Sequence, residues 1–143
     1  MRPRLLNVCL LLTLTWLPAA AQNAKSNGYG PEIKSFLDFM RHEEDELEYQ
    51  IKHNEISPRE YVRSKSRILI HRQTVLNLAR ETGEDRVPEL HVVTAQEIDQ
   101  LIENGTSAIK GIKRGDVIKE KWRYMGSVHR GETFHILERL ANR

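Results

Sequence analysis

The sequence predicts an α+β fold, in which an N-terminal antiparallel helical hairpin is followed by a short strand, a short helix and a C-terminal β-hairpin. Apolar residues recur at three- and four-residue steps over residues 31–82, which is the period of an amphipathic helix. A polar break at residues 52–55 divides this stretch into two helices. After residue 88 the pattern changes to short β-branched and aromatic runs, which are typical of strands.

Residues 1–21 have the layout of a secretory signal peptide. Two arginines precede an apolar run over residues 5–17, which is too short to span a bilayer that needs about 20 residues. A proline and three alanines follow, so we expect cleavage after Ala21. The alternative is an uncleaved membrane anchor. Cleavage predicts an exported protein, either periplasmic or secreted.

Removal of 21 of the 143 residues leaves a mature chain of 122 residues, which is the size of one domain. We expect residues 22–30 to form a flexible lead-in and residues 31–143 to form a single α+β domain. Within this domain, residues 31–85 are the helical hairpin and residues 87–143 are a small β-containing subdomain.

The mature chain has balanced charge and no cysteine. The leader contains two of the 22 basic residues and none of the 20 acidic ones, so 20 of each remain. Cys9, the only cysteine, is also in the leader. The mature domain must therefore be stabilised by apolar packing, which a chain of about 120 residues can supply. An exported domain without cysteine fits a bacterial periplasm or medium better than an animal secretory pathway.

The first helix is predicted from Pro31 to about His53. Proline suits the first helical position because its missing N–H has no partner there in any case. The apolar stripe of this helix consists of Ile33, Phe36, Leu37, Met40, Leu47 and Ile51.

The second helix is predicted from Pro58 to Thr82. Ser57 and Glu60 have the spacing of a capping box, in which each residue satisfies a free backbone N–H near the other. Gly83 suits the left-handed turn at a helix exit. The short connection makes the two helices antiparallel neighbours.

Three charged residues fall within the facing apolar stripes of these helices, namely Glu44, Lys65 and Arg72. When the chain folds back about residues 55 and 56, Glu44 comes to the level of Lys65, and Arg72 lies toward the Asp38 end of the first helix. A buried charge without a partner costs several kcal/mol. We therefore predict that these charges form structural ion pairs that fix the register of the hairpin.

The β-containing part begins with a strand predicted over residues 90–93. Thr94 and Glu97 form a second capping box, which opens a short helix that closes at Asn104-Gly105. The sheet should pack on the helical hairpin, because some apolar residues lie off the two stripes and need a second cover. These off-stripe residues are Phe39, Ile70 and Leu78.

Two further strands are predicted, over Asp116–Met125 and Glu132–Leu140. Residues 129–131 would form a three-residue loop with Gly131 in the left-handed position. This register places Tyr124 opposite Ile136 and Trp122 opposite Glu138. One buried face would then contain Trp122, Tyr124, Phe134 and Ile136.

No catalytic or metal-binding motif is found in the sequence. The six histidines include no His-x-x-x-His pair and have no cysteine nearby in the mature chain. There is no Gly-x-Ser-x-Gly, phosphate-binding loop or dinucleotide fingerprint. We therefore predict no catalytic residue, metal ligand or cofactor. The alternative is an enzyme or metal-dependent protein whose site is assembled from scattered His and Asp or Glu residues.

The C-terminal segment is basic, with nine Lys or Arg and four Asp or Glu in residues 106–143. Strand alternation would place several of them opposite the apolar face, and others at the hairpin tip and on the partner strand. An anionic partner would be attracted to such a surface, and the alternative is a solvated face whose lysines prevent edge-to-edge aggregation. The candidate binding residues are Lys119, Lys121, Arg123, Arg130 and His135.

These observations favour a non-catalytic exported interaction module. Its expected partner is anionic, either an envelope polymer or an acidic protein surface. Export argues against nucleic acid as the partner.

Overall fold

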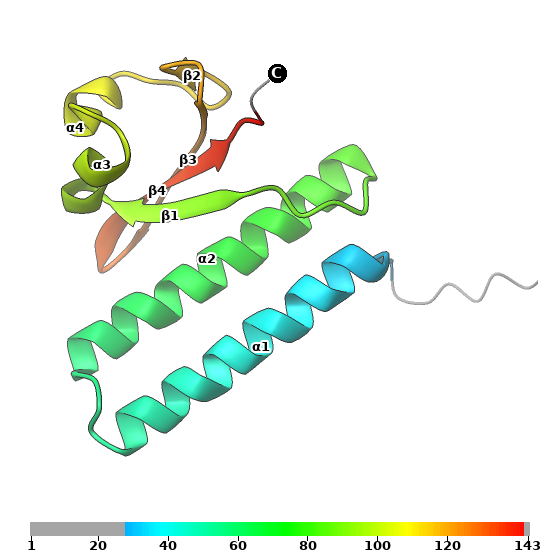
Figure 1. Cartoon of the computed structure of the whole chain (residues 1–143), viewed down its shortest axis with the longest axis vertical. Coiled ribbons are helices and arrows are strands. Elements are labelled where there is room, and N and C mark those ends of the chain that lie inside the picture. Colours follow the sequence, from blue (N-terminus) through cyan, green and yellow to red (C-terminus); the bar gives the residue numbers. More distant parts are fainter. Residues whose placement is uncertain (1–27, 142–143) are drawn as a thin grey trace, which may run out of the picture.

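The computed structural model describes residues 28–141 and confirms the predicted α+β fold (Figure 1). A helical hairpin is followed by a short strand, short helices and a C-terminal β-hairpin. The predicted signal peptide, and the lead-in up to residue 27, lie outside the described residues. Within residues 28–141, no helix combines the length and the apolar character that a membrane crossing needs.

Four strands form one antiparallel sheet in the order β1-β4-β3-β2. In Figure 1, α2 lies between α1 and the sheet, and the short helices α3 and α4 lie on the other side of the sheet. The elements are α1 (Pro31–Lys52), α2 (Pro58–Thr82), β1 (Leu90–Thr94), α3 (Ala95–Leu101), α4 (Gly105–Ala108), β2 (Val117–Ile118), β3 (Trp122–Arg130) and β4 (Glu132–Arg139).

The local signals at the ends of α2 and at the start of α3 act as predicted. The Ser57 N–H donates to the Glu60 carboxylate at 2.9 Å, and the Glu60 N–H donates to the Ser57 hydroxyl at 3.2 Å. Gly83 ends α2 with φ of 72°, which glycine adopts without a steric cost. At the start of α3, the Thr94 N–H donates to Glu97 at 2.8 Å.

The start of α1 is capped by a residue that is distant in the sequence. The carboxylate of Asp85 accepts hydrogen bonds from the N–H groups of Glu32 and Ile33, both at 3.0 Å. In return, the Glu32 carboxylate accepts from the Val87 N–H at 2.8 Å. Gly30 is needed beside this contact, because a Cβ there would lie 2.1 Å from an Asp85 carboxylate oxygen. These bonds tie the start of α1 to the segment that follows α2.

The sheet is buried on both faces, so residues 28–141 form two hydrophobic cores. The core on the helical-hairpin side contains Ile33, Ile70, Val75, Ala79, Leu90, Phe134 and Ile136. The core under α3 and α4 contains Ile98, Ile102, Ile118, Trp122, Tyr124 and Leu137.

Two of the three off-stripe residues of the helical hairpin are covered, as the sequence predicts. Ile70 is buried against the sheet, and Leu78 is half-buried. Phe39 remains 54% exposed on α1, so the expectation that the sheet covers it is wrong. The sheet packs over α2, and the side of α1 that carries Phe39 faces away from the packed elements.

The predicted register of the C-terminal hairpin is wrong for two reasons. Arg130 pairs directly with Glu132, so the predicted three-residue loop is absent, and β3 contains a β-bulge. Tyr124 pairs with Leu137, and Gly126 pairs with Ile136, so that Met125 is an extra residue on β3. A bulge of this kind reverses the side on which the following residues of the strand point. Gly126 has φ of 125°, a conformation that side-chain-bearing residues rarely adopt.

This bulge separates the four aromatic and apolar residues that were predicted to share one face. Trp122 and Tyr124 pack in the core under α3 and α4. Phe134 and Ile136 pack in the core against the helical hairpin. Both faces of the sheet are therefore apolar, and neither is the basic face that strand alternation predicts.

The predicted strand over residues 116–125 is in fact two strands joined by a tight turn. Lys119 and Glu120 lie between β2 and β3 with φ of 46° and 57°. Two consecutive residues with positive φ are typical of a hairpin turn that usually contains Asn or Gly. Lys119 and Glu120 occupy these positions in place of Asn or Gly, so the sequence does not indicate this turn. In the next hairpin, Gly131 is left-handed as predicted, with φ of 73°. The predicted loop over residues 129–131 is wrong, because His129 and Arg130 belong to β3 and pair with Thr133 and Glu132.

Candidate functional site

Charged residues in the helical hairpin form a compact network. The Lys65 ammonium lies 3.9 Å from Glu44 and 2.7 Å from Glu48, and it donates to the Tyr61 hydroxyl at 2.8 Å. The hydrogen bond to Glu48, followed by the one to Tyr61, raises the pKa of Lys65. Lys65 is therefore held in its charged form, which suits an ion pair rather than a catalytic base.

Arg72 joins the same network through Glu44. Its guanidinium lies 3.5 Å from the Glu44 carboxylate, although the sequence placed Arg72 toward Asp38. Glu44 is thus positioned between Lys65 and Arg72 on the facing helix. The three residues predicted to be structural lie together, and they hold α1 and α2 in register.

The structure does not place the five predicted binding residues on one face of the sheet. His135 lies on the face under α3 and α4, where its Nδ1 is 3.1 Å from the Tyr124 hydroxyl. Burial lowers the pKa of His135. The other four, which are Lys119, Lys121, Arg123 and Arg130, line hollows away from that face. Strand alternation was the wrong reason for grouping them, because Lys119 and Lys121 lie in the turn before β3.

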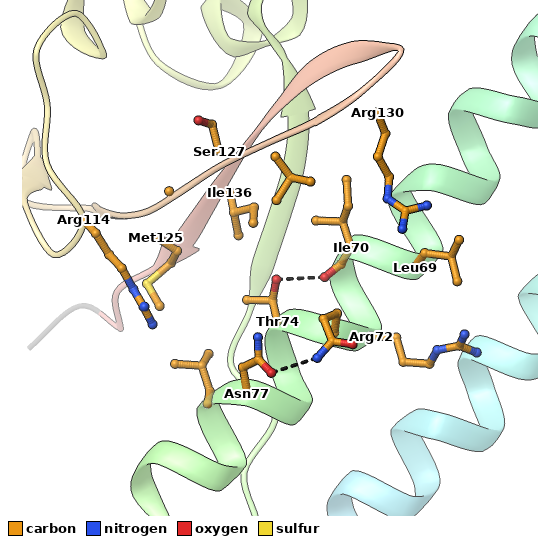
Figure 2. Close-up of a pocket in the computed structure, with 14 residues that line it drawn as sticks. Leu69, Ile70, Arg72, Thr74, Asn77, Arg114, Met125, Ser127, Arg130 and Ile136 are labelled. Atoms are coloured by element: carbon orange, nitrogen blue, oxygen red, sulfur yellow. Dashed lines mark hydrogen bonds between the residues drawn. The ribbon is translucent and has the colours of Figure 1, made fainter.

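Three adjoining hollows form a groove along β3. The first lies between α2 and β3 and has a volume of about 330 Å³ (Figure 2). The second, of about 140 Å³, shares Leu78 and Met125 with the first. The third, of about 780 Å³, shares Arg86, Arg123 and Glu138 with the second. The hollows therefore follow one another from the tip of the β3–β4 hairpin to the turn before β3.

We call this feature the basic groove because cationic side chains outnumber carboxylates along it. The cationic residues that line it are Arg72, Arg86, Arg114, Lys119, Lys121, Arg123, Arg130 and Arg139. The three acidic residues that line it are Glu84, Glu120 and Glu138.

The first hollow combines an apolar wall with arginines, and no carboxylate of residues 28–141 lines it. Figure 2 shows Ile70, Met125 and Ile136 around it, with Arg114 and Arg130 reaching toward α2 from different sides. The hydroxyl of Thr74, which also lines this hollow, donates to a backbone carbonyl of α2 at 2.8 Å. The hollow can thus accommodate a ligand that carries both apolar and anionic groups.

Ion pairs neutralise part of the charge along the groove. Glu138, which is 7% exposed, lies 2.9 Å from Arg123 and 4.0 Å from Arg86. Arg114 is paired with Glu81 of α2 at 3.0 Å. Two further pairs fall at the third hollow, between Lys119 and Glu103 at 3.2 Å and between Arg139 and Glu89 at 3.3 Å.

Two cations of the groove have no ion pair within residues 28–141, and these are Lys121 and Arg130. Both are exposed, at opposite ends of the groove. They can bind an anion without first breaking a contact inside the described part of the protein. Sequence reasoning selected both of them but missed Arg72, Arg86, Arg114 and Arg139 as groove residues. These come from α2, from two loops and from the end of β4, and only the fold brings them to one groove.

The alternative hypothesis of a metal-dependent site lacks a residue cluster in the described part of the chain. Within residues 28–141, no three His, Cys, Asp or Glu side chains converge in a way that could hold a metal ion. The groove itself offers guanidinium and ammonium groups, which donate hydrogen bonds to anions. Comparisons with protein-family models, curated proteins and solved structures find no match to this chain, so its function must be inferred from this geometry.

Proposed function

We propose that this chain is a non-catalytic interaction module, periplasmic or secreted, that binds an anionic partner along the basic groove. The observation that carries the proposal is the lining of the groove, where eight cationic side chains meet three carboxylates. The partner is an envelope polymer or an acidic protein surface. Arginine is well suited to this role, because its planar guanidinium can donate two parallel hydrogen bonds to a carboxylate or phosphate.

The arrangement of the groove favours recognition of an extended anion over that of a single ion. Arg130 lies in the first hollow and Lys121 in the third, so the cations without an ion pair are separated by the length of the groove. Between them, Arg123 and Arg86 are held in place by the buried carboxylate of Glu138. A partner with several negative charges can contact both ends at once.

Charge reversal at the two ends of the groove tests this proposal. The variant combines Lys121→Glu and Arg130→Glu, and we expect it to elute from a sulfated-polysaccharide matrix at lower salt than the unmodified chain. Electrostatic attraction between exposed groups is screened over about 8 Å at physiological salt, so retention of the unmodified chain should also fall as salt rises. Arg123 is left unchanged, because a glutamate there would oppose the buried Glu138.

The matched control carries Lys34→Glu and Lys110→Glu. Both lysines are exposed and neither lines the groove, so the control has the same change in net charge. Elution of the control near the unmodified chain, with earlier elution of the groove variant, is the expected result. Equal shifts in both variants would show that net charge alone governs retention and would refute binding in the groove.

A further inference from the structure

One edge of the sheet is open along the first hollow. β2 pairs with β3 only at Trp122 and Arg123. Two backbone hydrogen bonds follow on this side of β3, and they are the last there within residues 28–141. The Tyr124 N–H donates to the Asp116 carbonyl at 2.9 Å, and the Gly115 N–H donates to the Tyr124 carbonyl at 2.7 Å. Within residues 28–141, no strand pairs with this side of β3 beyond Tyr124. The open edge therefore comprises residues 125–130, a length of about 20 Å at 3.3 Å per residue.

The bulge determines which backbone groups this edge presents. The N–H and C=O of Tyr124 point toward β2, and the groups of alternate residues point the same way along a regular strand. Met125 adds one residue to the count, so the next groups that point away from β4 belong to Ser127 and His129. Backbone groups at an open edge can pair with a strand from another chain.

The open edge and the first hollow are formed by the same residues. Met125, Gly126, Ser127, Val128 and Arg130 all line the hollow, and α2 forms its opposite wall. A strand added beside β3 would lie at the mouth of this hollow. Its alternate side chains would point into the hollow, because successive side chains of a strand point to opposite faces.

We infer that the partner of the first hollow is an extended acidic peptide that adds to β3 as a fifth strand of the sheet. The inference rests on the proposed function and specifies the chemistry of the partner. The peptide backbone pairs with Ser127 and His129, which supplies affinity, and its inward side chains enter the hollow, which supplies specificity. The charge of the hollow favours acidic side chains, because Arg130 lines it without an ion pair in residues 28–141 and no carboxylate of these residues lines it. The other two lining arginines, Arg72 and Arg114, are paired with Glu44 and Glu81.

A second copy of this chain fits the edge less well. Pairing of two β3 edges would bring two basic grooves together, and like charges across a strand pair are destabilising. Arg130, at the end of the edge, adds to this repulsion. An acidic peptide, in contrast, complements the edge in both hydrogen bonding and charge.

The test uses the full chain and a capped, fluorescent hexapeptide of alternating glutamate and valine. Two derivatives of the peptide carry N-methyl groups on alternate amides, one on the odd set and one on the even set, so that charge and sequence are unchanged. Only one set of amides can face β3, because alternate groups of a strand point to opposite sides. We expect one derivative to bind at least about tenfold more weakly, which corresponds to the loss of two hydrogen bonds, and the other to bind like the unmodified peptide.

Protein variants locate the binding. Arg130→Glu should weaken binding of the unmodified peptide, whereas Lys34→Glu, which has the same change in charge outside the groove, should leave it unchanged. Hydrogen exchange of the Ser127 and His129 amides should slow when the peptide binds, which reports pairing at the edge without any substitution.

The outcomes separate this inference from the proposed function. If both N-methylated peptides bind like the unmodified one and Arg130→Glu weakens all three, strand addition is refuted and anionic binding in the groove stands. If no peptide binds while the sulfated matrix still distinguishes the groove variant, strand addition is likewise refuted. If the edge amides are protected by self-association of the chain at the concentrations used, a second copy is the occupant and the peptide is not.

Discussion

At the scale of single residues, protonation of His71 should make the free energy of unfolding depend on pH. Its ring on α2 is half-buried and lies 5.3 Å from the ring of Phe36. Burial lowers the pKa of His71 below the ordinary value of 6.5, and the nearby His91 adds to this effect. The folded protein therefore binds this proton less readily than the unfolded chain does.

The free energy of unfolding should fall as pH decreases below 6.5, because the unfolded chain takes up the proton at His71 first. The contribution is fully present above this pH and is lost as the pH falls toward the lower pKa of the folded state. Urea unfolding at pH 7, 6 and 5 would measure this slope. The His71→Leu variant should have a smaller slope over this range, and an unchanged slope would contradict the role of His71.

The charged residues of the helical hairpin could be identified from the sequence, but not all of their contacts could. A helical wheel and the position of the bend place Glu44 at the level of Lys65, and the two lie 3.9 Å apart. The shorter contact of Lys65 is with Glu48 at 2.7 Å. A helical wheel predicts the face of the helix on which a residue lies, and the bend predicts its height along the helix. Which carboxylate Lys65 contacts most closely also depends on the rotamers of both side chains.

At the scale of elements, the cap of α1 by Asp85 links two distant parts of the chain. Asp85→Ala removes two hydrogen-bond acceptors from the first turn of α1. We expect a loss of about 1–2 kcal/mol in the free energy of unfolding, which is the usual cost of a lost helix cap. Chemical denaturation at neutral pH would measure it.

Asp38→Ala is the control for this prediction. Asp38 is an exposed carboxylate on the same helix, and its ion pair with Arg41 is on the surface, so its removal should cost little. Equal losses in the two variants would show that the Asp85 cap has no special contribution.

Elements whose ends carry local signals could be predicted from the sequence, and elements set by distant contacts could not. The bounds of α2 follow from Ser57, Glu60 and Gly83, which lie within or beside the helix. The cap of α1 comes from a residue 53 positions away from Glu32, and no local pattern indicates it. The turn at Lys119 also lacks the residues that usually mark a hairpin turn. The bulge at Met125 does have a marker in the sequence, because Gly126 follows it and a glycine inside a strand often marks a bulge.

At the scale of the whole molecule, the two helices depend on the sheet. Ile70, Val75 and Ala79 of α2 are buried in a core that is completed by Leu90, Phe134 and Ile136. A chain that ends at Asp85 retains the α1 cap but loses this cover. We expect it to be unstable or to self-associate, because an uncovered apolar face of this size is unfavourable in water. Circular dichroism and sedimentation velocity would test this, and a stable monomeric hairpin would refute it.

The same dependence on the fold explains how much of the candidate site was predictable. The basic C-terminal segment is evident from its composition, and four of the five residues selected from it line the groove. His135 was misplaced because its neighbours on the sheet depend on the bulge. Arg72 and Arg86 come from outside that segment, and only the packing of α2 beside β3 brings them to the site.

Because β3 contains one extra residue, the fold depends more on the number of residues in this strand than on their identities. Before Met125, the even-numbered residue Tyr124 faces α3 and α4, and after it the even-numbered Val128 faces the helical hairpin. Loss of one residue here would turn Val128 and Arg130 to the opposite face and bring Ser127 and His129 into their places. Strand ends commonly tolerate insertions and deletions, but any chain that shares this fold and this groove must keep the number of residues between Tyr124 and Gly131.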